Sequence, residues 1–469
     1  MSKFSFVYIG SFLILLSLFS FFNIIYSYYF NIFFNINTYI YTLFLCLSLG
    51  SFLIFYNKIK FTKTTLYSKI LTVLFGYFFF PLIISIPYTL SIYNITILDC
   101  YFEAVSGFTS TGFTIFDNIK QIDQSLILWR STSQWIGGLY FLFSILVLID
   151  IFDENLKKSL TNYLSFNSSE IFKQSFKIII IYTLLTLGAF IILKFINLRT
   201  FDAFNFALTI ISSGGFLSIN NFDILFDSDI SKIILSILML SSYFSLFLTY
   251  NLIFFKRKNL NYFGEDFNLL IYILIIISFI FVFFNYENNF LDVLVSISSS
   301  VSNLGISFNG ISTNLSFVFL ILVIIGGSFF STSSGLRLIK VLTLIKFSLN
   351  NLSSHTKPNQ IYLNKVSLID SNINKSDINK YFLAIIIFII SLFTITLLLT
   401  ITNIDFESSF KLGILTIMNT VNSQMYGLAD FDFYNLSFFA KFCLIIFMII
   451  GRVELLTLFI LFKKFLFKN

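Results

Sequence analysis

Long apolar runs recur along almost the whole chain, and they constrain its fold more than any other feature. A helix that crosses the hydrocarbon core of a membrane needs about 20 mostly apolar residues. Runs of that length occupy ten stretches, at about residues 4–30, 36–56, 68–92, 128–152, 176–196, 230–255, 267–286, 316–346, 380–402 and 434–466. Only 11% of the 469 residues are charged. The sequence therefore predicts an all-α polytopic membrane protein with ten transmembrane helices.

No segment is expected to fold as a separate soluble domain. The longest polar interval, roughly residues 348–380, is too short and too rich in Asn, Ser and Lys to build its own core. The first apolar run follows a single Lys and has no small-residue cleavage site after it, which favours a retained span over a signal peptide. Cys46, Cys100 and Cys443 are widely separated and the single His355 lies in the polar interval. Neither a disulfide framework nor a metal centre is expected.

Basic residues gather in alternate connections, and this bias predicts the orientation. The basic set comprises Lys58, Lys60, Lys63, Lys157, Lys158, Lys173, Lys177, Lys256, Arg257, Lys258, Arg337, Lys340, Lys346, Lys357, Lys365, Lys375, Lys380, Lys463, Lys464 and Lys468. The other connections hold little beyond Lys120, Arg199 and Lys411. The positive-inside rule therefore places both termini in the cytoplasm. The expected location of the chain is the cell inner membrane.

The opposite connections contain most of the acids, although the chain carries a net charge of +7. These acids are Asp99, Glu103, Asp117, Asp123, Asp202, Asp223, Asp227, Asp229, Glu287, Asp292, Asp405, Glu407, Asp430 and Asp432. Two interpretations are open. The acids are simply the charged residues left on the outer side when Lys and Arg gather on the inner side, or they form a negative surface that concentrates cations at a pore mouth.

Four external connections of about 30–40 residues share a pattern, which indicates a repeated span–pore loop–span unit. Irregular backbone is tolerated at membrane depth only where it is buried in protein or lines a watery path. The first three open with an acid and have a glycine thirteen residues later: Asp99 and Gly112, Asp202 and Gly215, Asp292 and Gly305. The fourth opens with Glu407, but Thr420 stands thirteen residues on. The repeat is clear in three copies and degenerate in the fourth.

The composition of these loops suits a cation path. Backbone carbonyls can replace the water around a dehydrated cation, and glycine permits the unusual backbone angles that aim them at one axis. The hydroxyls of "SGFTSTGFT" (106–114) can pair freed backbone groups or add oxygens. Small residues can also serve only to let helices pack closely. Three loops in register, with acids at the start of each short helix, favour the cation path.

The stretches "FEAVSGFTSTGFT" (102–114), "WRSTSQWIGG" (129–138), "ISSGGFLS" (211–218), "GGSFFSTSSGLRLIK" (326–340) and "GRVELLTLF" (451–459) occur in this order. They resemble motifs of the Trk/Ktr/HKT superfamily of potassium transporters, and most of all its bacterial TrkH-type subunits. The resemblance covers nearly the whole chain. It implies four M1–pore loop–M2 repeats around a central pore, plus an N-terminal helix pair. The implied units are residues 1–66 (helix pair), 67–165, 166–262, 263–352 and 379–469 (repeats), with 353–378 as a cytoplasmic connection.

The same resemblance assigns a potassium-binding filter. Its residues are Ser110, Thr111 and Gly112; Ser213, Gly214 and Gly215; Asn303, Leu304 and Gly305; and Val421 and Asn422. The fourth family segment usually reads like "SNVGPG", whereas the nearest match here is "NTVNSQM" (419–425). A two-residue shift then puts Asn422 at the glycine position, where Asn tolerates a positive φ. This departure leaves open a sodium-permeable or weakly selective pore.

The resemblance also implies a gate below the filter, in the small-residue stretch at 326–335. Its residues are Gly326, Gly327, Ser328, Ser331, Thr332, Ser333 and Gly335, together with Arg452 in the pore. The alternatives are a Gly/Ser kink without function and a structural contact of Arg452 with Glu454 or a carbonyl. Trp129, Arg130 and Trp135 are interpreted as an interfacial anchor.

The expected function is potassium uptake driven mainly by the membrane potential. The resemblance implies a homodimer in membrane lipid and a cytoplasmic nucleotide-binding TrkA-type regulatory subunit. This chain has no nucleotide-binding motif of its own. We expect no cofactor besides the transported K⁺, no nucleic-acid partner and no enzymatic activity. Two rivals are an intramembrane enzyme for lipid-linked substrates, which needs acids, His or Arg at an interface pocket, and a non-conducting scaffold, which the fourth loop alone supports.

Overall fold

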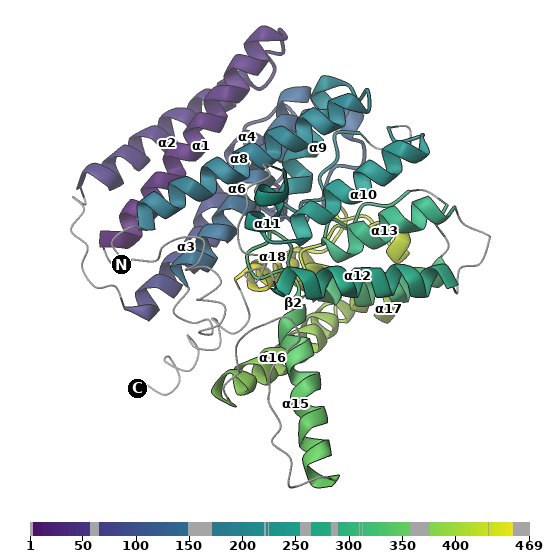
Figure 1. The fold of residues 1–469 in the computed structure, drawn as a ribbon. Helices are drawn as coiled ribbons and strands as arrows, with labels where there is room; N and C mark the ends of the chain where they lie inside the picture. Colours follow the sequence, from purple (N-terminus) through teal and green to yellow (C-terminus); the bar gives the residue numbers. More distant parts are fainter. Residues whose placement is uncertain are drawn as a thin grey trace.

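The computed structural model describes residues 3–56, 65–148, 171–219, 222–223, 225–253, 264–282, 289–308, 310–311, 313–356, 375–429 and 431–453. These residues are mostly helical (Figure 1). The helices are α1 Lys3–Tyr29, α2 Ile36–Tyr56, α3 Leu66–Ile84, α4 Ile86–Thr89, α5 Ile97–Phe108, α6 Gln124–Val147, α8 Ile171–Phe195, α9 Thr200–Ile211, α10 Asp229–Tyr243, α11 Leu246–Ile253, α12 Gly264–Val282, α13 Phe290–Val301, α14 Ser316–Ile324, α15 Leu338–Thr356, α16 Lys375–Thr400, α17 Phe406–Ile417 and α18 Phe438–Arg452.

Within the described ranges, six stretches are helical, long and apolar enough to cross a membrane. They are Ser5–Tyr29, Ile36–Tyr56, Leu66–Thr89, Gln174–Phe195, Gly264–Val282 and Asp377–Thr400. Each coincides with one of the ten spans predicted from the sequence. These helices turn exposed apolar side chains outward, as a lipid-facing surface requires.

The other four predicted spans take a different form. The stretch at 128–152 is represented by α6, whose residues from Ser125 to Val147 are all buried. The stretch at 230–255 breaks between α10 and α11, and that at 316–346 breaks between α14 and α15. In the stretch at 434–466, α18 ends at Arg452, and residues from 454 onward lie outside the described part. At the break between α10 and α11, the freed backbone groups find partners in the 326–335 segment: the Leu246 N–H donates to the Phe330 carbonyl oxygen, and the Tyr243 carbonyl oxygen accepts the Ser328 N–H, both at 3.0 Å.

The N-terminal helices α1 and α2 lie along one edge as an antiparallel pair (Figure 1). Their backbones approach closely where Gly10 faces Gly50, because a Cβ on Gly10 would lie only 3.0 Å from the Gly50 carbonyl oxygen. The ring of Phe12 on α1 packs edge-on against Tyr140 of α6, with 4.9 Å between centroids. The pair is thus attached to the rest of the bundle through α6, and also through α3, where the Ser5 and Thr72 hydroxyls lie 2.6 Å apart.

Two ion pairs join the start of a short helix to a helix from elsewhere in the chain. Asp99, in the first turn of α5, pairs with Lys441 of α18 at 2.5 Å, and both side chains are buried. Asp292, in the first turn of α13, pairs with Lys232 of α10 at 2.6 Å. The predicted acids do begin these short helices, where they complement the helix dipole. They also bind lysines in the neighbouring helices.

The all-α prediction needs one addition. Two-residue strands, β1 (Ile325–Gly326) and β2 (Leu336–Arg337), pair in parallel with Ile325 opposite Leu336. They flank a segment at 327–335 that is not helical, so the predicted interruption of this apolar run is present. Beyond it, α15 projects away from the bundle beside α16 (Figure 1).

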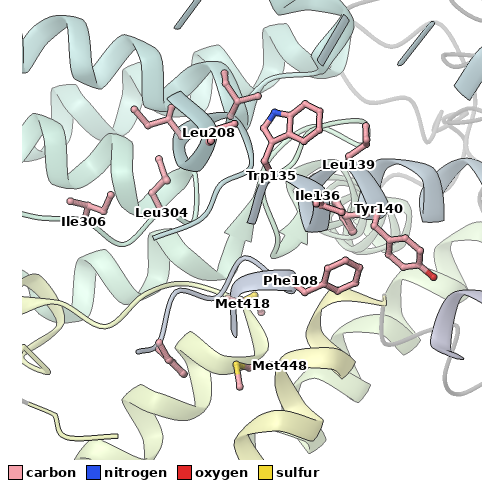
Figure 2. Close-up of a cluster of buried hydrophobic side chains, with 14 of the residues drawn as sticks. Phe108, Trp135, Ile136, Leu139, Tyr140, Leu208, Leu304, Ile306, Met418 and Met448 are labelled. Atoms are coloured by element: carbon pink, nitrogen blue, oxygen red, sulfur yellow. The ribbon is translucent and has the colours of Figure 1, made fainter. Parts of the chain in front are cut away.

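Buried apolar side chains surround the ends of the short helices (Figure 2). Phe108, the last residue of α5, faces Ile136 and Tyr140 of α6, and the Phe108 and Tyr140 ring centroids are 5.2 Å apart. Met418, just beyond α17, and Met448 of α18 are both buried. These buried apolar side chains enclose the polar loops in close-packed surroundings that resist distortion.

Candidate cation pathway

The four short helices α5, α9, α13 and α17 each have twelve residues and end in the same backbone turn. Two residues after each helix comes a left-handed residue: Ser110 (φ 58°), Ser213 (53°), Asn303 (60°) or Asn419 (49°). The next residue's N–H donates to the carbonyl five positions back: Thr111 to Ser106, Gly214 to Thr209, Leu304 to Ser299 and Thr420 to Leu415, at 2.8–3.0 Å. The fourth loop therefore has the same backbone turn as the other three.

This shared turn corrects the alignment of the fourth loop. Gly112, Gly215 and Gly305 each stand two residues beyond the left-handed residue, and the corresponding fourth residue is Val421. Asn422 lies one position further on and donates from Nδ2 to the Leu428 carbonyl oxygen at 3.0 Å. The thirteen-residue count reached Thr420 because Glu407 is the second residue of α17, whereas Asp99 is the third of α5.

Gly112, Gly215, Gly305 and Val421 meet at one place, which we call the central ring. A Cβ on Gly112 would lie 3.0 Å from Gly215 Cα and 3.1 Å from Val421 Cβ. A Cβ on Gly215 would lie 2.9 Å from the Leu304 carbonyl oxygen, and one on Gly305 would collide with the Val421 carbonyl oxygen. The structure thus brings residues from all four predicted filter segments together.

Two buried asparagines join the segments behind the central ring. Asn419 Nδ2 donates to Thr111 Oγ1 at 3.0 Å and to the Met448 carbonyl oxygen at 2.8 Å. Asn303 Nδ2 donates to Thr420 Oγ1 at 3.2 Å and to the Val323 carbonyl oxygen at 3.0 Å. The fourth segment is thereby bonded to the first and third segments and to α18, and the third segment is bonded to α14.

The second segment is bonded to α6 and to the 326–335 loop. Gln134 Oε1 accepts a hydrogen bond from the Phe216 N–H at 3.2 Å, and the Ser213 and Thr332 hydroxyls lie 3.0 Å apart. Thr332 belongs to the predicted gate, so this contact connects that segment directly to the 326–335 loop. The Ser110 hydroxyl, by contrast, is buried without a hydrogen-bond partner.

The interpretation of Trp129, Arg130 and Trp135 as an interfacial anchor is wrong. All three are at most 3% exposed, and both indole N–H groups are bonded internally, to the Ile84 carbonyl and to Thr186. Arg130 Nε forms an ion pair with Glu103 Oε1 at 2.8 Å. A charge within an apolar helix needs such a partner, and here the partner comes from α5.

The Glu103–Arg130 pair supports the chain just beyond Gly112. Glu103 Oε2 accepts the Ile115 N–H at 3.0 Å, and Arg130 Nη2 donates to Thr114 Oγ1 at 2.9 Å. The guanidinium also lies 4.2 Å from the centroid of the Phe216 ring, next to Gly215. This single buried pair therefore contacts both the first and the second segment.

An open cavity of about 510 Å³ lies against the central ring. The predicted external connections enclose it, and Gly112, Gly215 and Val421 line it where it meets the ring. Its remaining lining residues are Thr114, Phe116, Asp117, Ile119, Arg130, Phe216, Leu217, Ile219, Asn422, Ala429, Phe431, Asp432 and Phe433. The carboxylates of Asp117 and Asp432 make it a place where a cation can approach the ring.

The 326–335 loop is tied to its surroundings by a buried arginine and by backbone bonds. Arg337 Nη1 donates to the carbonyl oxygens of Ser328 at 2.7 Å and Ser333 at 3.2 Å. Thr332 Oγ1 donates to the Ile211 carbonyl oxygen at 2.8 Å, at the end of α9. The Phe329 N–H donates to Glu265 Oε1 at 3.1 Å. The loop therefore lies beneath the second segment and follows a defined path.

Arg452, the last residue of α18, is buried and reaches the same loop. Its Nη1 donates to Ser334 Oγ at 2.5 Å, and the guanidinium lies 4.2 Å from the centroid of the Phe141 ring. Nε and Nη2 are buried without hydrogen-bond partners. Glu454, the alternative partner considered from the sequence, lies outside the described residues.

Several residues of this arrangement were not identified from the sequence. In the sequence, Glu103 is considered only for the sign of its charge and Lys441, which lies inside the predicted span 434–466, is not considered, although an ionic group near apolar helices indicates a buried partner. Asn419 was placed within the fourth segment without a role. The signal that could have found it is its match to Asn303, because Asn is the non-glycine residue that best occupies the left-handed region.

Comparisons with known proteins agree with the resemblance found in the motifs. No family model matches the chain. An uncharacterized cation transporter of Methanocaldococcus jannaschii is 26% identical over 411 residues, covering 82% of this chain and 80% of the relative. The Trk system potassium uptake protein TrkH of Salmonella typhimurium is 25% identical over 388 residues, covering 79% of each.

A solved structure extends the comparison to the fold. The crystal structure of the potassium transporter TrkH from Vibrio parahaemolyticus superposes with a TM-score of 0.81, covers 98% of each chain and is 20% identical. The chain therefore has the TrkH fold. The curated homologues are named as transporters and not as enzymes, in agreement with the expectation that the chain is no enzyme.

Proposed function

We propose that this membrane protein is a potassium uptake transporter of the TrkH type, which passes K⁺ inward through a channel-like pore. The observation that carries the proposal is the central ring, where four equivalent turns from distant parts of the chain converge. The choice of K⁺ as the transported ion rests on the curated relatives, which are named as Trk system potassium uptake proteins.

The ring and its turns would act as the selectivity filter. Ser110, Ser213, Asn303 and Asn419 hold the chain in a left-handed turn, so that the following residues run past one common point. Backbone carbonyls there would replace the hydration shell of the ion. The two asparagine amides join neighbouring segments, and this cross-linking favours a fixed spacing of those oxygens.

Below the filter, the 326–335 loop with Arg452 would act as a gate. Ser334 receives the Arg452 guanidinium, and Thr332 contacts both Ser213 and the end of α9. A cationic side chain beneath a cation filter repels an ion that rests there. Movement of the loop together with Arg452 would therefore open the path.

The finer architecture and the partners belong to the same proposal. The chain would form ten transmembrane helices, as an N-terminal pair and four repeats bounded as predicted from the sequence, with both termini in the cytoplasm. It would act as a homodimer with a cytoplasmic nucleotide-binding TrkA-type subunit, as the resemblance of its motifs implies. No cofactor besides the transported ion is required.

A sodium-permeable or weakly selective transporter of the same fold is the second candidate. The observation that favours it is Val421, which stands where each of the other three segments has a glycine. A filter with one different segment presents an unequal set of oxygens to the ion.

Reconstitution into liposomes tests the proposal and separates the two candidates. Purified protein should carry K⁺ into vesicles that are negative inside, and less Na⁺ under the same gradient. Equal permeation of K⁺ and Na⁺ would favour the weakly selective transporter. If neither ion enters faster than into protein-free vesicles, the transport proposal fails.

A further inference from the structure

We propose that the side chain of Val421 closes the central ring on its cavity side and limits the rate and the size of the cations that pass. The inference rests on the proposed transport function, and it assigns to one residue a property of this particular chain. The inference follows from the contacts of the Val421 isopropyl group with the three glycines, from its position at the cavity and from its branched shape.

The Val421 side chain faces the glycines of the other three segments. Its Cβ would lie 2.5 Å from a Cβ built on Gly215 and 3.1 Å from one built on Gly112. Its Cγ1 would lie 2.8 Å from a Cβ on Gly215 and equally close to one on Gly305. One side chain thus occupies the space that three glycines leave open. A side chain on any of these glycines would therefore crowd Val421, in addition to the backbone strain that the positive φ of Gly112 and Gly305 would impose.

The same side chain borders the open cavity. Val421 is partly exposed and lines the cavity together with Gly112 and Gly215. A cation that leaves the cavity for the ring therefore meets methyl groups instead of carbonyl oxygens. Apolar contact cannot compensate the loss of hydration, so the valine adds to the barrier for entry.

Two properties of valine make the obstruction persistent. Branching at Cβ restricts χ1, so the side chain has few ways to rotate aside. A left-handed backbone is also strained for a β-branched residue, and Val421 has no positive φ, whereas Gly112 has 86° and Gly305 has 78°. The fourth segment therefore cannot adopt the backbone of the first and third at this position without a substitution.

Removal of the side chain is the direct test. In proteoliposomes, Val421→Gly should raise K⁺ flux about tenfold, the effect of ~1.4 kcal/mol on a barrier. The gain should be larger for Cs⁺ than for Na⁺, because a bulky ion needs more of the space that the valine occupies. Val282→Gly is the matched control, because Val282 is an exposed valine at the end of α12 that is not part of the ring or of the cavity lining. This control should leave unchanged both the flux and the order in which K⁺, Cs⁺ and Na⁺ permeate.

A cysteine of similar size supplies a second test that does not depend on the glycine variant folding. The test compares the flux of Val421→Cys before and after a small cationic thiol reagent is added on the cavity side; whatever flux the unmodified variant has, the reagent should abolish it. The wild type should resist the reagent, since Cys46, Cys100 and Cys443 are all buried.

The outcomes separate this inference from the proposed function. If the wild type carries cations while Val421→Gly has the same rate and ion order, or modified Val421→Cys keeps its flux, the valine does not close the ring. If folded wild type and folded Val421→Gly both fail to carry any cation, the transport function itself is wrong.

Discussion

Arg130 and Glu103 form a buried ion pair, with 2.8 Å between Nε and Oε1, on helices that support the first two segments of the central ring. Removing one partner leaves the other as an unpaired buried charge. Glu103→Gln should therefore lower the free energy of unfolding by ~3–5 kcal/mol, and the midpoint of thermal unfolding in detergent should fall.

The control for this substitution is Glu407→Gln. Glu407 pairs with Lys411 at 2.6 Å, but its side chain is 77% exposed, so the loss should be about 0–1 kcal/mol. Equal midpoints for the two variants would show that the buried pair does not hold the first segment in place.

Gly112→Ala should distort the ring. Gly112 has a φ of 86°, and the added Cβ would lie 3.0 Å from Gly215 Cα, so both backbone strain and steric contact oppose the change. We expect lower K⁺ flux and a changed K⁺/Na⁺ ratio in vesicles. Gly188→Ala, on α8 with no atom within 4 Å of its Cβ, should be neutral. A normal ratio in Gly112→Ala would exclude this residue from the filter.

Asn419→Gly should weaken ion discrimination while keeping a residue that tolerates a positive φ. The substitution removes the amide bonds to Thr111 and Met448, each worth ~0.5–1.5 kcal/mol. Asn403→Gly changes the same residue type at a φ of 65°, outside the ring, and should not alter the ratio. Identical K⁺/Na⁺ ratios in the two variants would mean that the cross-link between segments does not affect selectivity.

Arg452→Ala should raise cation flux, because it removes a buried positive charge beside the 326–335 loop. Ser334→Ala removes only the hydrogen bond and should give a smaller increase. A stable Arg452→Ala protein with wild-type flux would assign this arginine a structural role.

Much of this fold was predictable, because membrane spans depend on length and hydrophobicity, which can be counted along a sequence. Six predicted spans appear as apolar helices of sufficient length. The interior helices were harder to predict. Their polar side chains, such as Gln134 and Arg130, are paired with residues far along the chain, and only the folded structure brings those residues together.

The candidate cation pathway was likewise predictable in part. The three glycines and the small-residue loop were found from their spacing and motifs, and the structure brings the glycines together. In the fourth segment, the count from the acid reaches Thr420, one residue short, because Glu407 stands one position earlier in α17, and the two-residue shift to Asn422 passes the equivalent position, Val421, by one. The backbone turn at Asn419, which determines the correct register, depends on hydrogen bonds and not on the acid.

Potassium uptake by the purified protein is the decisive measurement. Purified protein in liposomes with an inside-negative potential should take up K⁺ in preference to Na⁺, and Arg452→Ala should do so faster. The absence of cation uptake by both folded proteins, compared with protein-free vesicles, would contradict the account.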